Sequence, residues 1–253
     1  MNELKNRLTR ELQQDLQVKI LHSQYWNLPI HPLKVDFETV RQTKMDVLMK
    51  MLLIAFRESD FKDINQLSDV LLVEPLFIQN IVNKMLRAGL IEKREQIFTL
   101  TNKGVEQLKT ETFVEQPENC TEKLLYSPCH GMVLQGELED PNHEQFDEYR
   151  LYDHYSDWDV DILEISIIHK SLQGFLPVEE TPHVQTVIAE INSVAPLAID
   201  FLPCLEFQLY NQEKDIFYAR IWNTLLAEWD ETLEGQINAH DRQEWREKYK
   251  GKI

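Results

Sequence analysis

The sequence predicts an α+β protein with a helical arm, a small domain of helices and a hairpin, and an acidic C-terminal domain. Three observations lead to this prediction. Apolar residues recur at helical spacing through the first 110 residues, strand-like runs follow after about residue 120, and the net charge changes between these two parts. We expect an arm over 1–43, a domain over 44–115 and an acidic α+β domain over 116–253.

Charge separates the two parts of the chain clearly. The 253 residues carry a formal net charge of −17, yet residues 1–115 contain 16 Lys and Arg and 16 Asp and Glu. The whole excess of acid therefore lies after residue 115. Such a segment is repelled by nucleic acid and by anionic membranes, so a basic partner or simple solubility is the expected meaning of the charge.

Several classes of protein are disfavoured by composition. No apolar run approaches the roughly 18 residues that span a bilayer, and the first residues contain no apolar core of a secretory signal, so a cytoplasmic protein is expected. Three cysteines without a CxxC pair predict neither a disulfide framework nor a zinc site: Cys120, Cys129 and Cys204. Cys129 and His130 are the only adjacent pair of soft ligands, and we expect no metal and no cofactor.

The N-terminal arm is predicted to be helical. Leucines recur every four residues from Leu4 to Leu16, and Val18 and Ile20 extend the apolar pattern, so we expect a helix over 2–22. A connector over 25–32 should end it, because two prolines cannot continue a helix. A short helical lead-in is expected over 36–43.

Residues 44–110 predict three helices, a hairpin and a last helix. The first helix is apolar on nearly every side and should be buried. Asp63 can cap the second, Pro75 suits the first turn of the third, and Gly89 is the residue expected just past its end. The expected elements are helices over 44–56, 63–71 and 74–88, two strands within 90–100 around a charged turn at 93–96, and a helix over 101–108.

This order resembles the winged helix-turn-helix of MarR-like regulators. Two segments carry the resemblance: Leu-Arg-Ala-Gly-Leu-Ile-Glu-Lys over 86–93 and Phe-Thr-Leu-Thr-Asn-Lys-Gly over 98–104. They are similar to the end of the recognition helix with the first wing strand, and to the segment that follows the wing. The resemblance covers about a quarter of the chain. It implies a transcriptional regulator whose third helix enters the major groove of DNA while the wing touches the backbone or the minor groove.

The polar face of the third helix supplies the candidate contacts. Asn and Gln side chains can pair with adenine, and Arg and Lys with guanine or phosphate. The expected DNA-binding residues are Gln79, Asn80, Asn83, Lys84 and Arg87 on the helix, with Lys93 and Arg94 on the wing. The alternative is a protein-docking module in a larger assembly, because the domain has no net positive charge and Glu92 and Glu95 flank the two wing cations.

The acidic domain resembles no family by its motifs. We expect a linker over 111–122, strands over 123–126 and 131–134, a long loop over 137–157, a strand or helix over 160–169, a helix over 181–194, a hairpin over 205–221 and a final amphipathic helix over 222–237. The two terminal amphipathic helices either cover the core of their own domain or offer a surface to a second copy or a protein partner.

Catalytic motifs are weak. The cluster of acidic residues over 153–161 could bind Mg²⁺ or Ca²⁺, but its spacing fits no EF-hand and a surface loop is the favoured interpretation. Glu206 with Asp200 is faintly similar to the carboxylate sets of metal-dependent nucleases, although Gln208 stands where such enzymes have lysine. No phosphate-binding loop and no GxSxG elbow occur, so an enzyme is not expected.

Overall fold

The computed structural model describes residues 2–138, 146–179, 181 and 183–249. It is a mixed α+β protein that divides into two compact units, each made of separate stretches of the chain. The first unit comprises 1–35, 122–171 and 193–253, and the second comprises 36–121 and 172–192. The predicted domain over 44–115 lies entirely within the second unit. Among the described residues, no helix is long and apolar enough to cross a membrane.

The first unit is built on antiparallel strands. The central pair joins β1 (Val18–Lys44) to β8 (Asp200–Asn211), with a register from Val18 opposite Asn211 to Ile30 opposite Asp200 and an irregularity after Ile20. The remaining strands pair outward from this centre: β9 (Ile216–Asn223), β10 (Glu228–Trp229), β5 (Glu118–Ser127) and β6 (Met132–Leu134). The hairpin predicted over 205–221 and the strands predicted over 123–126 and 131–134 are confirmed.

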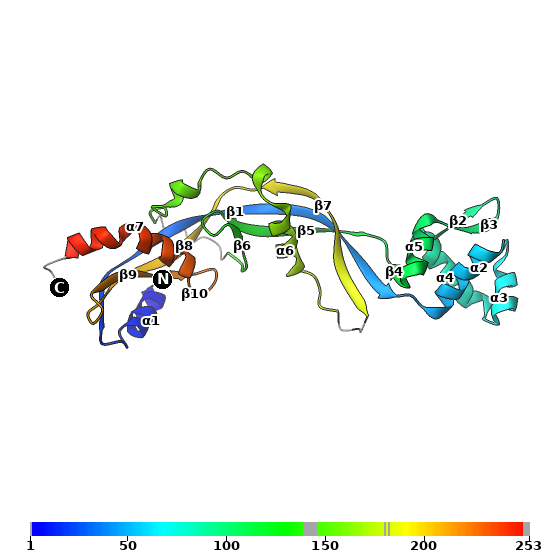
Figure 1. Ribbon diagram of the computed structural model, residues 1–253, viewed down its shortest axis with the longest axis horizontal. Helices are drawn as coiled ribbons and strands as arrows, with labels where there is room; N and C mark the ends of the chain where they lie inside the picture. Colours follow the sequence, from blue (N-terminus) through cyan, green and yellow to red (C-terminus); the bar gives the residue numbers. More distant parts are fainter. Residues whose placement is uncertain (1, 139–145, 180, 182, 250–253) are drawn as a thin grey trace. The chain divides into compact units, whose positions relative to one another are not determined.

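Helices cover both faces of β8 (Figure 1). α1 (Asn2–Leu12) packs Leu8 against the side chains of alternate β8 residues from Leu205 to Leu209. On the other face, Leu233 and Ile237 of α7 (Glu231–Tyr249) pack in the cluster that contains Cys204. Because successive strand residues point to opposite faces, the helices bury both the apolar Leu205, Phe207 and Leu209 and the polar Glu206 and Gln208 between them.

The N-terminal prediction is wrong beyond Leu12. α1 ends there, Leu16 is exposed, and Val18 begins a 27-residue strand that replaces the expected connector and helical lead-in. The prolines did not end the element, because a proline removes only a donor from a strand and its carbonyl still accepts. Pro32 O accepts from Leu197 N at 2.8 Å.

The second unit contains the helices and hairpin expected from the sequence. Its elements are α2 (Val47–Glu58), α3 (Ile64–Leu71), α4 (Pro75–Arg87), β2 (Ile91–Arg94), β3 (Ile97–Leu100), α5 (Asn102–Thr110) and β4 (Thr112–Val114). Asp46 caps α2 and Asp63 caps α3 through backbone N–H groups, while Pro75 opens α4. One apolar cluster joins all three first helices to the hairpin through residues such as Leu52, Ile78 and Phe98.

Three further expectations on the acidic part are corrected. The expected linker contains β4 and the start of β5, the helix expected over 181–194 is β7 (Val184–Pro196), and the helix expected over 222–237 begins only at Glu231. Trp222 and Trp229 lie opposite each other on β9 and β10, because pairing between these two strands outweighs the helical spacing of their apolar residues. The open choice over 160–169 resolves to a short 3-10 turn and α6 (Ile165–Gln173). Of the expected loop, 139–145 lies outside the described residues.

Candidate nucleic-acid interface

α4 presents one buried and one exposed side. Its buried residues are Ile78, Val82 and Met85, which follow the helical repeat and face the core of the second unit. The helix ends before Gly89, which adopts a left-handed conformation with φ of 70°. The opposite side of the helix is therefore left to solvent over its whole length.

All five residues predicted on α4 lie on this exposed side. Gln79 Nε2 donates to Asn83 Oδ1 at 2.9 Å, and Arg87 Nε donates to the Asn83 carbonyl at 3.4 Å. These contacts run along the helix and connect Gln79, Asn83 and Arg87. We call the exposed residues Leu76, Phe77, Gln79, Asn80, Asn83, Lys84 and Arg87 the outer strip of α4.

The hairpin holds the two other predicted residues. β2 and β3 pair from Ile91 opposite Leu100 to Arg94 opposite Ile97, and Glu95 and Gln96 between them both have positive φ. Two successive left-handed residues give the tight turn typical of a two-residue hairpin. Lys93 and Arg94 are both exposed beside this turn.

A shallow cleft of about 470 Å³ brings α4 and the hairpin together. Gln79 and Lys93 both line it, as do Lys62 and Asn65 at the start of α3. Lys93 Nζ also lies 5.2 Å from the centre of the Phe98 ring. The outer strip of α4 and the hairpin therefore belong to one surface. Lys62 was not predicted, because its position depends on how α3 approaches the hairpin.

The cations on this surface are partly neutralised. Lys84 Nζ lies 3.3 Å from Glu115 Oε1 and 4.5 Å from the centre of the Phe113 ring, and Arg94 pairs with Glu92 at 2.6 Å. Within the described chain, Arg87 and Lys93 form no ion pair. Exposed ion pairs contribute about 0–1 kcal/mol, so Lys84 and Arg94 can exchange their carboxylates for another anion at little cost.

Two apolar residues of the outer strip were missed by the sequence prediction. Leu76 is 69% exposed and Phe77 is 59% exposed, in the first turn of α4. Helical spacing could have revealed Leu76. It precedes Asn80, Asn83 and Arg87 by four, seven and eleven residues, and residues at these spacings share one side of a helix. The outer strip is apolar at its N-terminal end and becomes cationic toward its C-terminal end.

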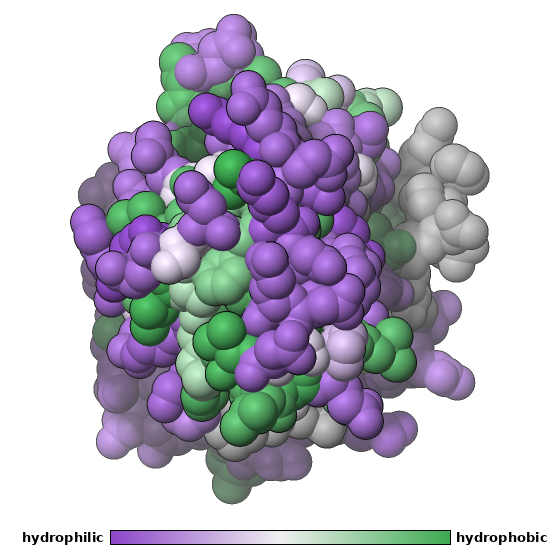
Figure 2. Space-filling view, turned by 90° about the vertical axis from the view of Figure 1, so that its right-hand side faces the viewer, coloured by the Kyte–Doolittle hydropathy of each residue, from purple (hydrophilic) through white to green (hydrophobic). Residues whose placement is uncertain are grey.

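The turn between α3 and α4 adds exposed apolar surface. Leu72 is 91% exposed and adopts a left-handed conformation with φ of 54°, and Val70 before it is also exposed. A left-handed leucine costs roughly 1–2 kcal/mol relative to the right-handed conformation. Figure 2 shows apolar side chains grouped among hydrophilic ones on this end of the second unit.

A Ser-His-Asp arrangement lies in the first unit. Ser127 Oγ and His130 Nδ1 are 2.7 Å apart, and His130 Nε2 lies 2.9 Å from Asp230 Oδ2. All three side chains are buried, and Asp230 Oδ1 also accepts from the Leu233 backbone at the start of α7. Although burial opposes it, hydrogen bonding to His130 holds the pKa of Asp230 below its usual value. The three groups tie the turn after β5 to α7 and leave no accessible nucleophile.

The cysteine beside this histidine is buried and protonated. Burial raises the pKa of Cys129 to about 12, and the nearby Asp230 carboxylate adds to the rise. The thiol therefore keeps its proton at neutral pH. Over the described ranges, no group of three or more His, Cys, Asp and Glu side chains is arranged to hold a metal ion, and this includes the acidic cluster over 153–161.

The carboxylates that suggested a nuclease are engaged with cations. Asp200 pairs with Lys123 at 3.2 Å, and the buried Glu206 accepts from Arg150 at 2.7 Å and from Trp26 at 2.9 Å. Asp241 lies on the other side of the same guanidinium at 2.5 Å. Each of the two carboxylates is thus compensated by a cation of its own.

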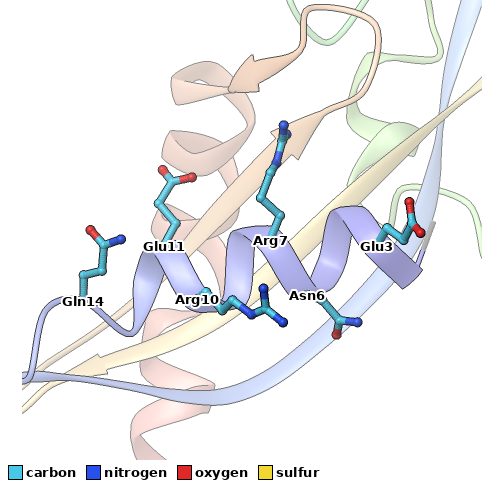
Figure 3. A pocket seen from close by; sticks show the side chains of 6 residues that line it. All are labelled: Glu3, Asn6, Arg7, Arg10, Glu11 and Gln14. Atoms are coloured by element: carbon cyan, nitrogen blue, oxygen red, sulfur yellow. The ribbon is translucent and has the colours of Figure 1, made fainter.

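The terminal helices offer polar surfaces to solvent. Figure 3 shows a surface hollow lined by Glu3, Asn6, Arg7, Arg10 and Glu11 of α1 and by Gln14, which follows the helix. The apolar side of α1 packs against β8, and Leu233, Ile237 and Trp245 of α7 are buried in the first unit. Both apolar stripes are thus covered within the chain itself.

No protein-family model, curated protein or solved structure matches the chain. The outer strip of α4 with the hairpin combines hydrogen-bonding side chains with exposed cations.

Proposed function

We propose that residues 44–115 form a winged helix-turn-helix domain that binds duplex DNA, and that the protein is a transcriptional regulator whose acidic part receives a ligand or a partner. The observation that carries the proposal is the outer strip of α4: five exposed hydrogen-bonding side chains on one side of the third helix, beside a hairpin with two exposed cations. A recognition helix and a wing present this arrangement to DNA.

The contacts divide into two kinds. Gln79, Asn80 and Asn83 would reach base edges in the major groove, because their amides both donate and accept. Arg87, Lys93 and Arg94 would hold phosphates, which set the position of the domain without reading sequence. Three phosphate contacts predict a slope of about −2.7 in log affinity against log salt concentration.

Fluorescence anisotropy of a labelled duplex tests the proposal. From about 50 to about 200 mM salt, three phosphate contacts predict a loss of affinity of roughly fortyfold. The variant Arg87→Ala/Lys93→Ala should bind more weakly, and its slope should fall to about −0.9. The matched control Lys103→Ala/Lys109→Ala removes the same charge from α5 and should behave as the wild type.

Either of two results would overturn DNA binding by this surface. One is the absence of binding at the lower salt concentration. The other is equal weakening by the α4–hairpin variant and the α5 variant, since that result would reflect total charge rather than a defined surface.

Protein docking is the second candidate, favoured by the exposed apolar residues Val70 and Leu72 before α4. Surface of this kind commonly marks an interaction site when it is contiguous. The variant Leu72→Asn should gain stability by about 0.5 kcal/mol, because asparagine tolerates the left-handed conformation. If the turn is a docking site, the same variant loses a partner that the wild type retains in co-purification.

A further inference from the structure

The composition of the outer strip points to the bases that it would contact. Between Leu76 and Asn83 it presents two apolar side chains and three amides, and its cations begin only at Lys84. Within the described residues, the Asn80 side chain makes no hydrogen bond, so it is free to contact a ligand. No carboxylate stands on the strip between Leu76 and Arg87.

We propose, on the basis of the proposed DNA binding, that this strip reads A·T base pairs in the major groove. The amides of the strip would form hydrogen bonds with adenine, and Leu76 and Phe77 would contact the methyl group of thymine. Adenine offers N7 as an acceptor and N6 as a donor, and thymine offers a methyl group. Guanine is read by Arg or Lys and cytosine by Asp or Glu. The first two turns of α4 contain none of these charged residues.

The contact between Gln79 and Asn83 sharpens the preference for adenine. Gln79 Nε2 donates to Asn83 Oδ1, which leaves Gln79 Oε1 as an acceptor and Asn83 Nδ2 as a donor. Adenine N6 can donate to the first of these atoms and adenine N7 can accept from the second. Guanine would place its O6 acceptor against Gln79 Oε1, so two acceptors would face each other.

Leu76 and Phe77 supply the apolar contact. Both are more than half exposed in the first turn, at the end of a recognition helix that approaches base edges. Burying one thymine methyl against them should strengthen binding about three- to fivefold. Loss of that methyl group alone should therefore be measurable.

Enrichment of a randomised duplex of about 20 base pairs on the whole protein supplies the probe. We expect the enriched sequences to be rich in A·T pairs at the positions that affect affinity. Thymines in the enriched duplex are then replaced one at a time by uracil, which removes only the 5-methyl group. At one or more positions the wild type should lose about three- to fivefold in affinity.

Two variants test whether Leu76 and Phe77 cause the loss of affinity on replacing thymine by uracil. Leu76→Ala/Phe77→Ala should bind thymine and uracil duplexes almost equally, whereas Val47→Ala/Met51→Ala, on the exposed side of α2, should retain the wild-type preference. Enrichment of G·C-rich sequences, no enrichment, or a uracil effect that persists in the Leu76/Phe77 variant would overturn this inference while leaving DNA binding intact. Absence of any duplex binding by the wild type would instead refute the proposed function, and with it this inference.

Discussion

Arg150 Nη1 donates to Glu206 Oε2 at 2.7 Å, and Glu206 is fully buried in the first unit. The same guanidinium reaches Asp241 on α7 through Nε at 2.7 Å. One cation thus compensates carboxylates on β8 and on α7, although the three residues are far apart in the sequence. Hydrogen bonding to both carboxylates keeps the pKa of Arg150 above its usual value despite burial, which opposes the charge.

Replacing Arg150 by methionine should destabilise the first unit by about 3 kcal/mol, because removal of one partner leaves a buried carboxylate without compensation. Urea unfolding at neutral pH measures this loss. Arg246→Met breaks an ion pair with Asp215 in which both side chains are about 60% exposed, and it should cost less than about 1 kcal/mol. Equal effects of the two substitutions would show that the buried cluster contributes no more than a surface pair.

His31 should make stability depend on pH. Burial holds its pKa below 6.5, and Nε2 lies 2.5 Å from the Tyr152 hydroxyl. As pH falls below 6.5, the unfolded chain takes up a proton while the folded protein does not, so stability falls until the folded pKa is passed.

The measurement is the free energy of unfolding of wild type and His31→Gln from neutral to mildly acidic pH. In the wild type, the free energy of unfolding should fall by up to about 1.4 kcal/mol per pH unit in that window, and His31→Gln should lack this dependence. His22→Gln, at an exposed position of the same strand, serves as the control. A slope that is identical in wild type and His31→Gln would exclude this histidine as its source.

Three glycines should respond differently to alanine. A Cβ at Gly104 would lie 2.1 Å from the Leu90 carbonyl oxygen, so Gly104→Ala should displace α5 from the hairpin and cost about 2 kcal/mol. Gly89→Ala meets open space but a left-handed backbone, and should cost about 1 kcal/mol. Gly235→Ala, within α7 and in open space, should stabilise by about 0.5–1 kcal/mol. The unfolding midpoint should therefore be highest for Gly235→Ala, lower for Gly89→Ala and lowest for Gly104→Ala. Any other order would contradict the surroundings described for the three glycines.

The helices around the candidate site were predictable because local signals define them. Asp63 caps α3, Pro75 starts α4 and Gly89 follows its end, and each acts within a few residues of its own position. The polar side of α4 follows from its apolar side by helical geometry alone. The ion pairs of Lys84 and Arg94 depend on packing and could not be predicted from the sequence.

The first unit was harder to predict because its pairings are distant. Val18–Lys44 is a strand because β8, almost 200 residues later, hydrogen-bonds to its first half. The leucine spacing that correctly predicts α1 continues by chance to Leu16, which is exposed in the turn before that strand. Likewise, nothing near Glu206 in the sequence indicates that Arg150 and Asp241 will surround it.

Site-specific photocrosslinking tests the central claim, that the outer strip of α4 contacts DNA, most directly. A photoreactive phenylalanine derivative is placed at position 83 on α4 or at position 51 on the exposed side of α2, and each protein is irradiated with a labelled duplex that it is first shown to bind. The account predicts a covalent protein–DNA adduct from position 83 and none from position 51. An adduct from position 51 alone, or no adduct from position 83 in a protein that binds the duplex, would contradict it.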